Sequence, residues 1–254
     1  MNTIIYKTIN KIIFKGEKWK ILSHHYPKRI VQRKLDKKGI VFLVGNITEA
    51  NRIRNFDNES EFIKQLMTEL TFSDVFYDLG ACIGLYSLHA ARRSQAVVAF
   101  EPEPEIRKHL VSNIELNELS NIMVLPYALS DVSKITYLYT DGVSGKSPSL
   151  QDLGFKDQIT VRTLRLDDVV YIEKVKAPDV IKIDVEGAEV HVLKGMKLVM
   201  EDHPPRAIFI EVHPKVLPNF GSSEQEVHFI LEKAGYKLIK QSKRDDQFHY
   251  IYRH

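Results

Sequence analysis

The sequence predicts an α/β fold: a mostly parallel sheet with helices on both of its faces, preceded by an N-terminal extension. Two observations support this prediction. From residue 74 onward, short apolar runs alternate with segments of helical periodicity, and repeated strand–helix units build parallel sheets that are covered on both faces. The chain of 254 residues is also long enough for one such domain with a substantial core. We therefore divide it into an extension, residues 1–70, and a domain, residues 71–254.

Composition and charge are those of an ordinary globular protein. The formal net charge of +3 permits an anionic partner but does not demand nucleic acid. Cys82 is the single cysteine, so no internal disulfide and no cysteine-based zinc site can form, which fits a reducing compartment. No segment approaches the ~20 apolar residues that span a bilayer. Lysines also interrupt the apolar positions of the N-terminus, so we do not expect the apolar core of a signal peptide there. We therefore expect a cytoplasmic protein.

The N-terminal extension is rich in lysine and arginine and contains three expected elements. Isoleucines at positions 5, 9, 12 and 13 recur near helical spacing, which predicts an amphipathic helix over 3–15. A strand is expected over 40–44 and a helix over 59–70. The basic helix could pack on the domain or on a partner subunit of a homo-oligomer. Alternatively, it contacts a membrane surface or an anionic acceptor.

The domain itself is expected to contain strands over 75–79, 96–100, 122–125, 179–184, 207–212, 236–240 and 248–252. Its expected helices are 84–93, 104–117 and 223–234. Residues 130–170 break this rhythm, because 135–139 and 159–164 alternate like antiparallel strands. Between them lies a polar loop, 140–154, rich in glycine and serine. An insertion of this kind near strand ends is a candidate substrate loop.

A glycine turn follows the first strand of the domain. Gly80 and Gly84 permit a tight bend and a close approach of the backbone to a ligand, to which the next helix presents N–H groups. The spacing lacks the middle glycine of the dinucleotide pattern G-x-G-x-x-G. This argues against a pyrophosphate and for a smaller moiety, such as the methionine end of S-adenosylmethionine; the alternative is a tight turn without a ligand. The candidate cofactor-binding residues of the turn are Asp78, Gly80, Ala81, Cys82 and Gly84.

Two later segments add cofactor candidates. Glu101 ends the second strand, and a carboxylate there can accept hydrogen bonds from both ribose hydroxyls of an adenosyl group. The alternative is an acid that favours the N-terminus of the next helix, which begins near Pro102. Tyr127 and Ala128 follow the third strand, where a cofactor base commonly lies against the chain. The sequence does not separate that role from an ordinary loop.

Acidic side chains gather where the fourth and fifth expected strands end. The candidate catalytic residues there are Asp184, Glu186, Glu211 and His213. Ligands of open α/β sheets bind at the carboxyl ends of strands, and ionised carboxylates at such ends are costly unless paired or liganded. Histidine titrates near neutrality, so His213 could take a proton from an acceptor hydroxyl; a structural histidine is the alternative. Glu186 and Glu189 could instead be acids in the first turn of a helix.

A metal site is the further alternative for this acidic cluster. Asp184, Glu211 and His213 come from two strand ends, and three such ligands are a plausible set. No spacing signature demands a metal ion, however, so none is expected.

Five segments resemble the FkbM-type S-adenosylmethionine-dependent methyltransferases. They occur in the family's order and extend over residues 72–254; they are 77–87, 99–102, 127–131, 181–189 and 210–214. The most distinctive is Asp-Val-Glu-Gly-Ala-Glu, beginning at Asp184. One position departs: the family often has asparagine where this chain has Cys82. That change puts a polar side-chain contact with the cofactor in question, although backbone contacts would survive.

The resemblance implies a Rossmann-like, seven-stranded class I methyltransferase fold whose last strand is antiparallel. It also implies methyl transfer from S-adenosylmethionine, usually to a hydroxyl on a sugar, glycan or natural-product scaffold. The implied cofactor contacts are Asp78, Gly80, Gly84, Glu101 and Ala128. Asp184 and Glu186 would lie beside the methyl donor, with Asp184 or His213 removing the acceptor proton.

Three other functions compete with this expectation. An RNA or protein methyltransferase would use the basic N-terminal third, but the sequence shows no recognised nucleic-acid-binding module. In addition, Asp184 to Gly187 occupies the place where enzymes that methylate amino groups have an N-P-P-Y type signature. A non-catalytic scaffold that only binds the cofactor is disfavoured, because it would not need an intact acidic cluster beside the methyl donor. A nicotinamide dehydrogenase is disfavoured by the absent middle glycine.

Overall fold

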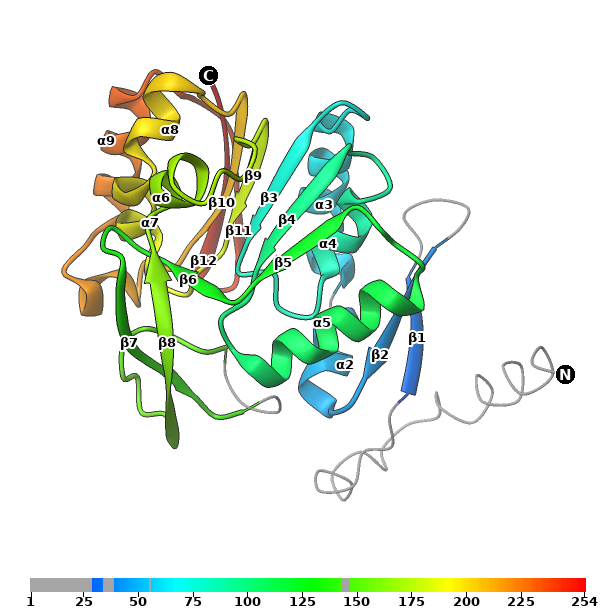
Figure 1. Cartoon of the computed structure of the whole chain (residues 1–254). Coiled ribbons are helices and arrows are strands. Elements are labelled where there is room, and N and C mark those ends of the chain that lie inside the picture. Colours follow the sequence, from blue (N-terminus) through cyan, green and yellow to red (C-terminus); the bar gives the residue numbers. More distant parts are fainter. Residues whose placement is uncertain (1–28, 34–38, 55, 143–146) are drawn as a thin grey trace, which may run out of the picture.

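The computed structural model describes residues 29–33, 39–54, 56–142 and 147–254, and its centre is a seven-stranded sheet (Figure 1). The strand order is β11-β12-β10-β9-β3-β4-β5. The strands are β3 (Val75–Leu79), β4 (Ala96–Phe100), β5 (Ile122–Leu125), β9 (Val180–Ile183), β10 (Ala207–Val212), β11 (Lys237–Arg244) and β12 (Gln247–Arg253). The last strand, β12, is antiparallel to both neighbours, whereas β10, β9, β3, β4 and β5 are parallel. The predicted fold class is confirmed.

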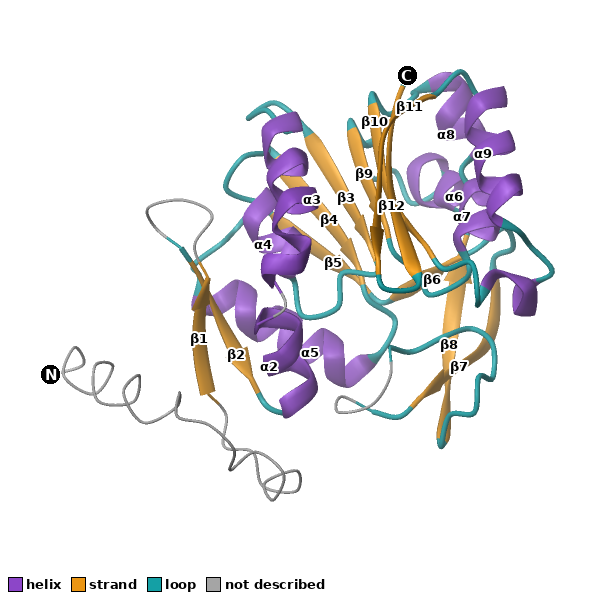
Figure 2. Ribbon diagram, turned by 180° about the vertical axis from the view of Figure 1, so that it is seen from behind, coloured by secondary structure: helices purple, strands orange, loops and turns teal. Residues whose placement is uncertain are grey.

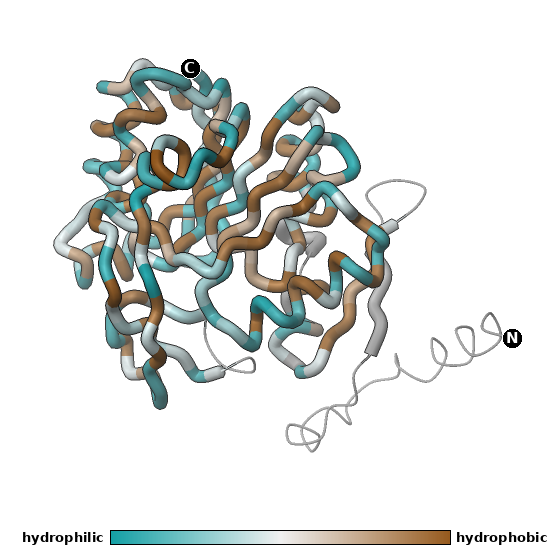
Figure 3. Tube along the Cα trace, in the orientation of Figure 1, coloured by the Kyte–Doolittle hydropathy of each residue, from teal (hydrophilic) through white to brown (hydrophobic). Residues whose placement is uncertain are grey.

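Helices cover both faces of this sheet (Figure 2). One face carries α3 (Phe56–Glu69), α4 (Leu85–Ala90) and α5 (Pro104–Leu116). The other carries α6 (Leu166–Tyr171), α7 (Glu189–Gly195), α8 (Lys197–Asp202) and α9 (Glu224–Lys233). Alternate residues of β3 point to opposite sides: Phe76 joins the core under α3 to α5, while Tyr77 joins the core under α7 to α9. The central strands are hydrophobic along their length for this reason (Figure 3).

A second sheet of three strands lies beyond the carboxyl edge of the first (Figure 1). It contains β6 (Tyr127–Leu129), β7 (Lys134–Thr140) and β8 (Asp157–Leu164), in the order β6-β8-β7. The predicted antiparallel pair is confirmed, since β7 and β8 are antiparallel. Residues 127–129, for which the sequence left an ordinary loop as one alternative, form a strand that pairs in parallel with β8. Part of the candidate substrate loop, 143–146, lies outside the described residues.

The described part of the N-terminal extension packs on the domain. Strand β1 (Arg29–Arg33) pairs with β2 (Ile40–Val44), which is followed by α2 (Ile47–Arg54). Asn113 on α5 and Asn117, which caps the C-terminus of that helix, complete the edge of β2: their side-chain oxygens accept from the backbone N–H groups of Leu43 (2.7 Å) and Val41 (2.9 Å), respectively. The helix predicted over 3–15 lies outside the described residues, and the division at residue 70 stays a prediction. No helix in the described ranges has both the length and the apolar character that crossing a membrane requires.

Candidate active site

Gly80 brings the end of β3 into contact with the end of β9. Its φ is +82°, and an added Cβ would lie 1.9 Å from the carbonyl oxygen of Asp184. The backbone N–H groups of Gly80 and Ala81 both donate to the carbonyl of Phe100 on β4, at 3.2 and 2.9 Å. A side chain at Gly80 has no space and an unfavourable backbone angle, so the turn is fixed against both neighbouring strands at the carboxyl edge of the sheet.

Glu101 closes the other side of this turn. Its Oε2 accepts from the backbone N–H of Cys82 (2.9 Å), and its Oε1 accepts from the N–H of Glu103 (2.9 Å). The helix-capping role belongs to Glu103, whose Oε2 accepts from the N–H of Ile106 at the start of α5. A carboxylate oxygen has two lone pairs, and Glu101 lines the pocket described below, which makes it a candidate to accept from a ligand hydroxyl.

Cys82 itself has a left-handed backbone conformation, with φ of +51°. Asparagine tolerates this region better than most side chains, which gives a conformational reason for the family's preference at this position. Cys82 contributes the backbone N–H that holds Glu101. That contact does not depend on the side chain.

Lys182 is a buried cation beneath the turn, with 2% of its surface exposed. Its Nζ donates to the carbonyl of Gly80 (3.0 Å) and lies 3.3 Å from a carboxylate oxygen of each of Asp78 and Asp184. Asp78 is fully buried and also accepts from the Ser87 hydroxyl (2.5 Å). Burial opposes a charged lysine, but Asp78 and Asp184 outweigh it and raise the pKa of Lys182. The ammonium therefore links the glycine turn to the acidic end of β9.

Four carboxylates surround the imidazole of His213. Nδ1 lies 2.6 Å from Glu189 Oε1, and Nε2 lies 3.3 Å from Glu186 Oε2. Asp184 and Glu211 each have an oxygen within 4 Å of Nε2, at 3.9 and 3.8 Å. Glu186 has a left-handed backbone, with φ of +52°, which is costly for a residue other than glycine. The loop after β9 is thus held in an unfavourable conformation that directs this carboxylate toward His213.

The ionisable groups of this cluster shift one another's pKa values. Burial disfavours a protonated His213, but the hydrogen bond that its Nδ1 donates to Glu189 and the charges of Glu186 and Asp184 outweigh it and raise its pKa to about 10. Burial also opposes ionisation of Asp184, whose pKa is nevertheless held below its usual value by Lys182 and His213. Burial raises the pKa of Glu186. The imidazole therefore balances carboxylates that water reaches poorly.

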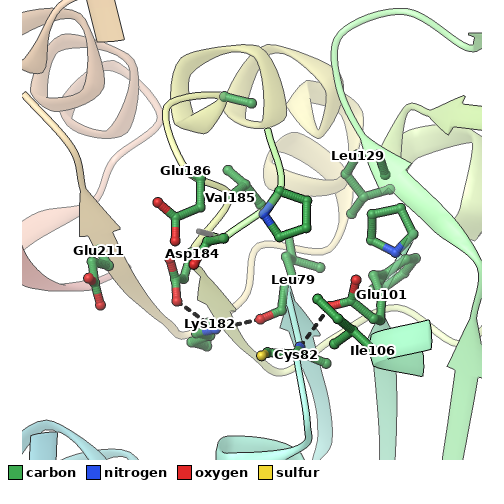
Figure 4. A pocket seen from close by; sticks show the side chains of 18 of the residues that line it. Leu79, Cys82, Glu101, Ile106, Leu129, Lys182, Asp184, Val185, Glu186 and Glu211 are labelled. Atoms are coloured by element: carbon green, nitrogen blue, oxygen red, sulfur yellow. Dashed lines mark hydrogen bonds and ion pairs between the residues drawn. The ribbon is translucent and has the colours of Figure 1, made fainter. Parts of the chain in front are cut away.

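One pocket brings most of the predicted residues together (Figure 4). Those that line it are Gly80, Ala81, Cys82, Glu101, Pro102, Tyr127, Ala128, Asp184, Glu186 and Glu211. Asp78, Gly84 and His213 do not line it. Asp78 and His213 are buried behind its wall, and a Cβ on Gly84 would lie 2.2 Å from the Leu88 side chain of α4. Asp78 and Gly84 therefore shape the turn, and a direct cofactor contact from either stays a prediction.

A family model described as the methyltransferase FkbM domain matches residues 78–238, from the glycine turn into β11. The chain belongs to the FkbM methyltransferase family.

Relatives of this FkbM chain include curated methyltransferases. It is 28% identical over 208 residues to hexuronic acid methyltransferase AglP of Haloferax volcanii, a match that covers 82% of each protein. It is 31% identical over 189 residues to methyltransferase sdnD of Sordaria araneosa, covering 57% of this chain and 71% of that protein. Among solved structures, methyltransferase FkbM from Methylobacillus flagellatus is similar at 18% identity and a TM-score of 0.48, covering 73% of this chain and 44% of that one.

Three residues of this FkbM site were missed by the sequence reasoning. Lys182 carried a usable signal, since it is a lysine within an otherwise apolar strand. Glu189 begins α7, as the sequence allowed, but its carboxylate is fully buried against His213. Arg244 comes from the far end of β11, lines the pocket and lies 3.4 Å from Glu211. Only the fold brings these last two to the site, so no local pattern could have identified them.

Proposed function

We propose that this FkbM-family chain is an S-adenosylmethionine-dependent O-methyltransferase whose acceptor is a hydroxyl on a sugar, a glycan or a small natural product. One observation carries the proposal. The Glu101 carboxylate and the acidic residues Asp184 and Glu186 line the same pocket, on either side of the glycine turn. A ribose contact and a proton-accepting cluster are thus available to one bound cofactor and one acceptor.

The residues around the turn fit an adenosyl cofactor. Glu101 offers two carboxylate oxygens to the ribose hydroxyls. Apolar side chains from β4, α5 and β6 line the adjoining wall and suit a purine; they include Phe100, Ile106, Tyr127 and Leu129. Gly80 lines the pocket, and the lack of a side chain lets the turn pack directly against the Asp184 carbonyl. We assign the methionine end to the turn and the base to this apolar wall.

S-adenosylmethionine, when bound, supplies a methyl group on a sulfonium that an acceptor oxygen can attack in line. The chain's own contribution is to orient the acceptor and to remove its proton. Asp184 faces the pocket, and His213 lies directly behind it, 3.9 Å away. Asp184 is our candidate for the proton acceptor, because the raised pKa of His213 keeps that imidazole protonated near neutral pH. Glu186 and Glu211 complete the polar wall that the acceptor contacts.

The acceptor class rests on similarity and on the pocket's chemistry. The relative from Haloferax volcanii, similar over 82% of its length, is named for a hexuronic acid. Carboxylates and Arg244 on one pocket wall suit a ligand with several hydroxyl or acidic groups. We therefore place sugars and sugar acids first among the acceptors to be tried.

The test is transfer of a labelled methyl group from S-adenosylmethionine to a panel of neutral sugars, uronic acids and glycans. Wild type should label at least one of them, and Asp184→Asn should not, while still binding the cofactor in calorimetry. Asp246→Asn is the matched control, because Asp246 is exposed and forms an ion pair with Lys215 outside the pocket. Label that appears solely in RNA or protein, or full activity of Asp184→Asn, would contradict the proposal.

A further inference from the structure

Asp184, Glu186 and His213 present three potential metal ligands to one point beside the pocket. One ligand atom from each lies within 4.8 Å of the others, and Figure 4 shows the Asp184 and Glu186 carboxylates side by side above Lys182. We propose that these residues bind a divalent cation of the Mn²⁺ and Mg²⁺ class. The sequence suggested a metal site only as an alternative, at Asp184, Glu211 and His213, because no motif spaces these ligands; in the structure Glu186 joins the set in place of Glu211.

The orientation of His213 is the main support for this site. Its Nδ1 pairs with Glu189 Oε1 at 2.6 Å, and that oxygen is fixed in turn by the backbone N–H of Gly187 (3.0 Å). In its neutral form, a ring that donates Nδ1–H to a carboxylate presents its Nε2 lone pair, which is the arrangement usual for metal-binding histidines; a divalent cation would take the place of a proton on Nε2. Nε2 is directed between Asp184 and Glu186. It is buried, and among the described residues it has no hydrogen-bond partner.

Unsatisfied charge at the same point supports a cation. Asp184 Oδ1 is a second buried atom that lacks a hydrogen-bond partner within the described ranges. Four carboxylates lie within 4 Å of a nitrogen of His213. Lys182 pairs with Asp184, and Arg244 with Glu211, but neither reaches Glu186 in the ion pairs of the structure. Glu186 pairs with His213, which three other carboxylates share. Negative charge therefore exceeds positive charge at this point, and a divalent ion would offset it.

The distances suit octahedral coordination. With bonds of about 2.1 Å, adjacent ligands lie roughly 3 Å apart and opposite ligands roughly 4.2 Å apart. The separations of His213 Nε2 from Glu186 (3.3 Å) and from Asp184 (3.9 Å) lie between these limits. Two carboxylates and one imidazole suit Mn²⁺ or Mg²⁺ better than a soft metal. Asp184 and Glu186 also line the pocket, so the remaining positions face the acceptor.

The catalytic part of this inference rests on the proposed function, whereas cation binding does not. An acceptor hydroxyl bound to the cation becomes more acidic and is held in a fixed position. In that case His213 and Asp184 act as ligands, and the proton leaves to solvent. The cation would therefore place the acceptor oxygen beside the glycine turn.

The experiment is a titration of the full-length protein with Mn²⁺, in which electron paramagnetic resonance measures the concentration of the free ion. Wild type should bind one Mn²⁺ per chain. Binding should weaken at least tenfold in Glu186→Gln and be lost in His213→Ala. Glu186→Gln keeps the shape of a partly exposed side chain and guards against misfolding of the buried histidine variant. Glu105→Gln, on the exposed surface of α5, is the control and should bind like wild type.

Absence of saturable binding, or equal binding by wild type and both cluster variants, would overturn the site. Calorimetry with S-adenosylmethionine on the same samples separates the two proposals. Cofactor binding without Mn²⁺ binding would reject the cation site alone. Mn²⁺ binding without cofactor binding would reject the proposed function and leave the cation site standing.

Discussion

Replacing Lys182 with methionine tests whether the buried ammonium holds the site together. The substitution keeps the length and apolar stem of the side chain but leaves Asp78 and Asp184 without the cation that lies 3.3 Å from each. At an effective dielectric constant of 20, each pair contributes about 5 kcal/mol of attraction, offset by several kcal/mol for desolvating the ions. Removing one partner of a buried ion pair costs about 3–5 kcal/mol. We expect Lys182→Met to lower the free energy of unfolding by that amount.

Urea denaturation measures this loss, and two further variants make it specific. Asp78→Asn in the Lys182→Met background removes one stranded carboxylate, so the double variant should be more stable than the single one. Lys197→Met is the control, because the Lys197 side chain is 70% exposed and its ammonium lies 3.7 Å from Glu201; it should cost less than about 0.5 kcal/mol. If Lys182→Met costs less than about 1 kcal/mol, or if Asp78→Asn does not rescue it, Lys182 does not have this role.

Three further predictions follow from the same geometry. Gly80→Ala should abolish cofactor binding and cost about 2–4 kcal/mol of stability, because its Cβ would meet the Asp184 carbonyl. Gly142 has a similar φ but open space around it, so Gly142→Ala should cost only about 1–2 kcal/mol. Equal losses of stability in the two variants would contradict this prediction. Glu101→Gln should weaken S-adenosylmethionine about tenfold to a hundredfold in calorimetry, since a charged acceptor bond contributes about 1.5–3 kcal/mol; unchanged affinity would remove Glu101 from the ribose site. Burial opposes ionisation of Asp74, but hydrogen bonds from Arg206 outweigh this effect and lower the pKa of Asp74. The pair therefore stabilises the fold fully above the unfolded pKa of Asp74, near 4, and this stabilisation is lost as the pH falls through the lower folded pKa. The difference in unfolding free energy between wild type and Arg206→Met should shrink below pH 4 in urea titrations, and a constant difference would refute the pairing.

The main sheet and the glycine turn could be predicted from the sequence because their signals are local. Buried parallel strands are apolar along their whole length, and β3 ends directly at Gly80. The short helices α6, α7 and α8, of six or seven residues each, were not predicted. They are buried over much of their surface and too short to show helical periodicity. Strand β11 extends to Arg244, four residues beyond the prediction, because its outer part is polar and is defined by pairing with β12.

For the site, the sequence could predict which strand ends contribute side chains, but not how those side chains are oriented. Asp184, Glu186 and Glu211 follow from the rule that ligands bind at the carboxyl edge of the sheet, and all three line the pocket. The orientation of His213 depends on Glu189, 24 positions earlier in the chain, and this contact exists only after β10 and α7 pack together. A metal site was only an alternative at the level of the sequence, with Glu211 in place of Glu186, because the evidence for the ligand set is the direction of one imidazole ring.

Calorimetric titration of the full-length protein with S-adenosylmethionine, alongside NAD, tests the central claim most directly. The account predicts saturable binding of one S-adenosylmethionine per chain, weakened by Glu101→Gln and unaffected by Glu105→Gln, with no binding of NAD. The exposed Glu105 side chain on α5 pairs with Lys108 outside the pocket. Binding of NAD without S-adenosylmethionine would contradict the assignment of the pocket between Gly80 and Glu101.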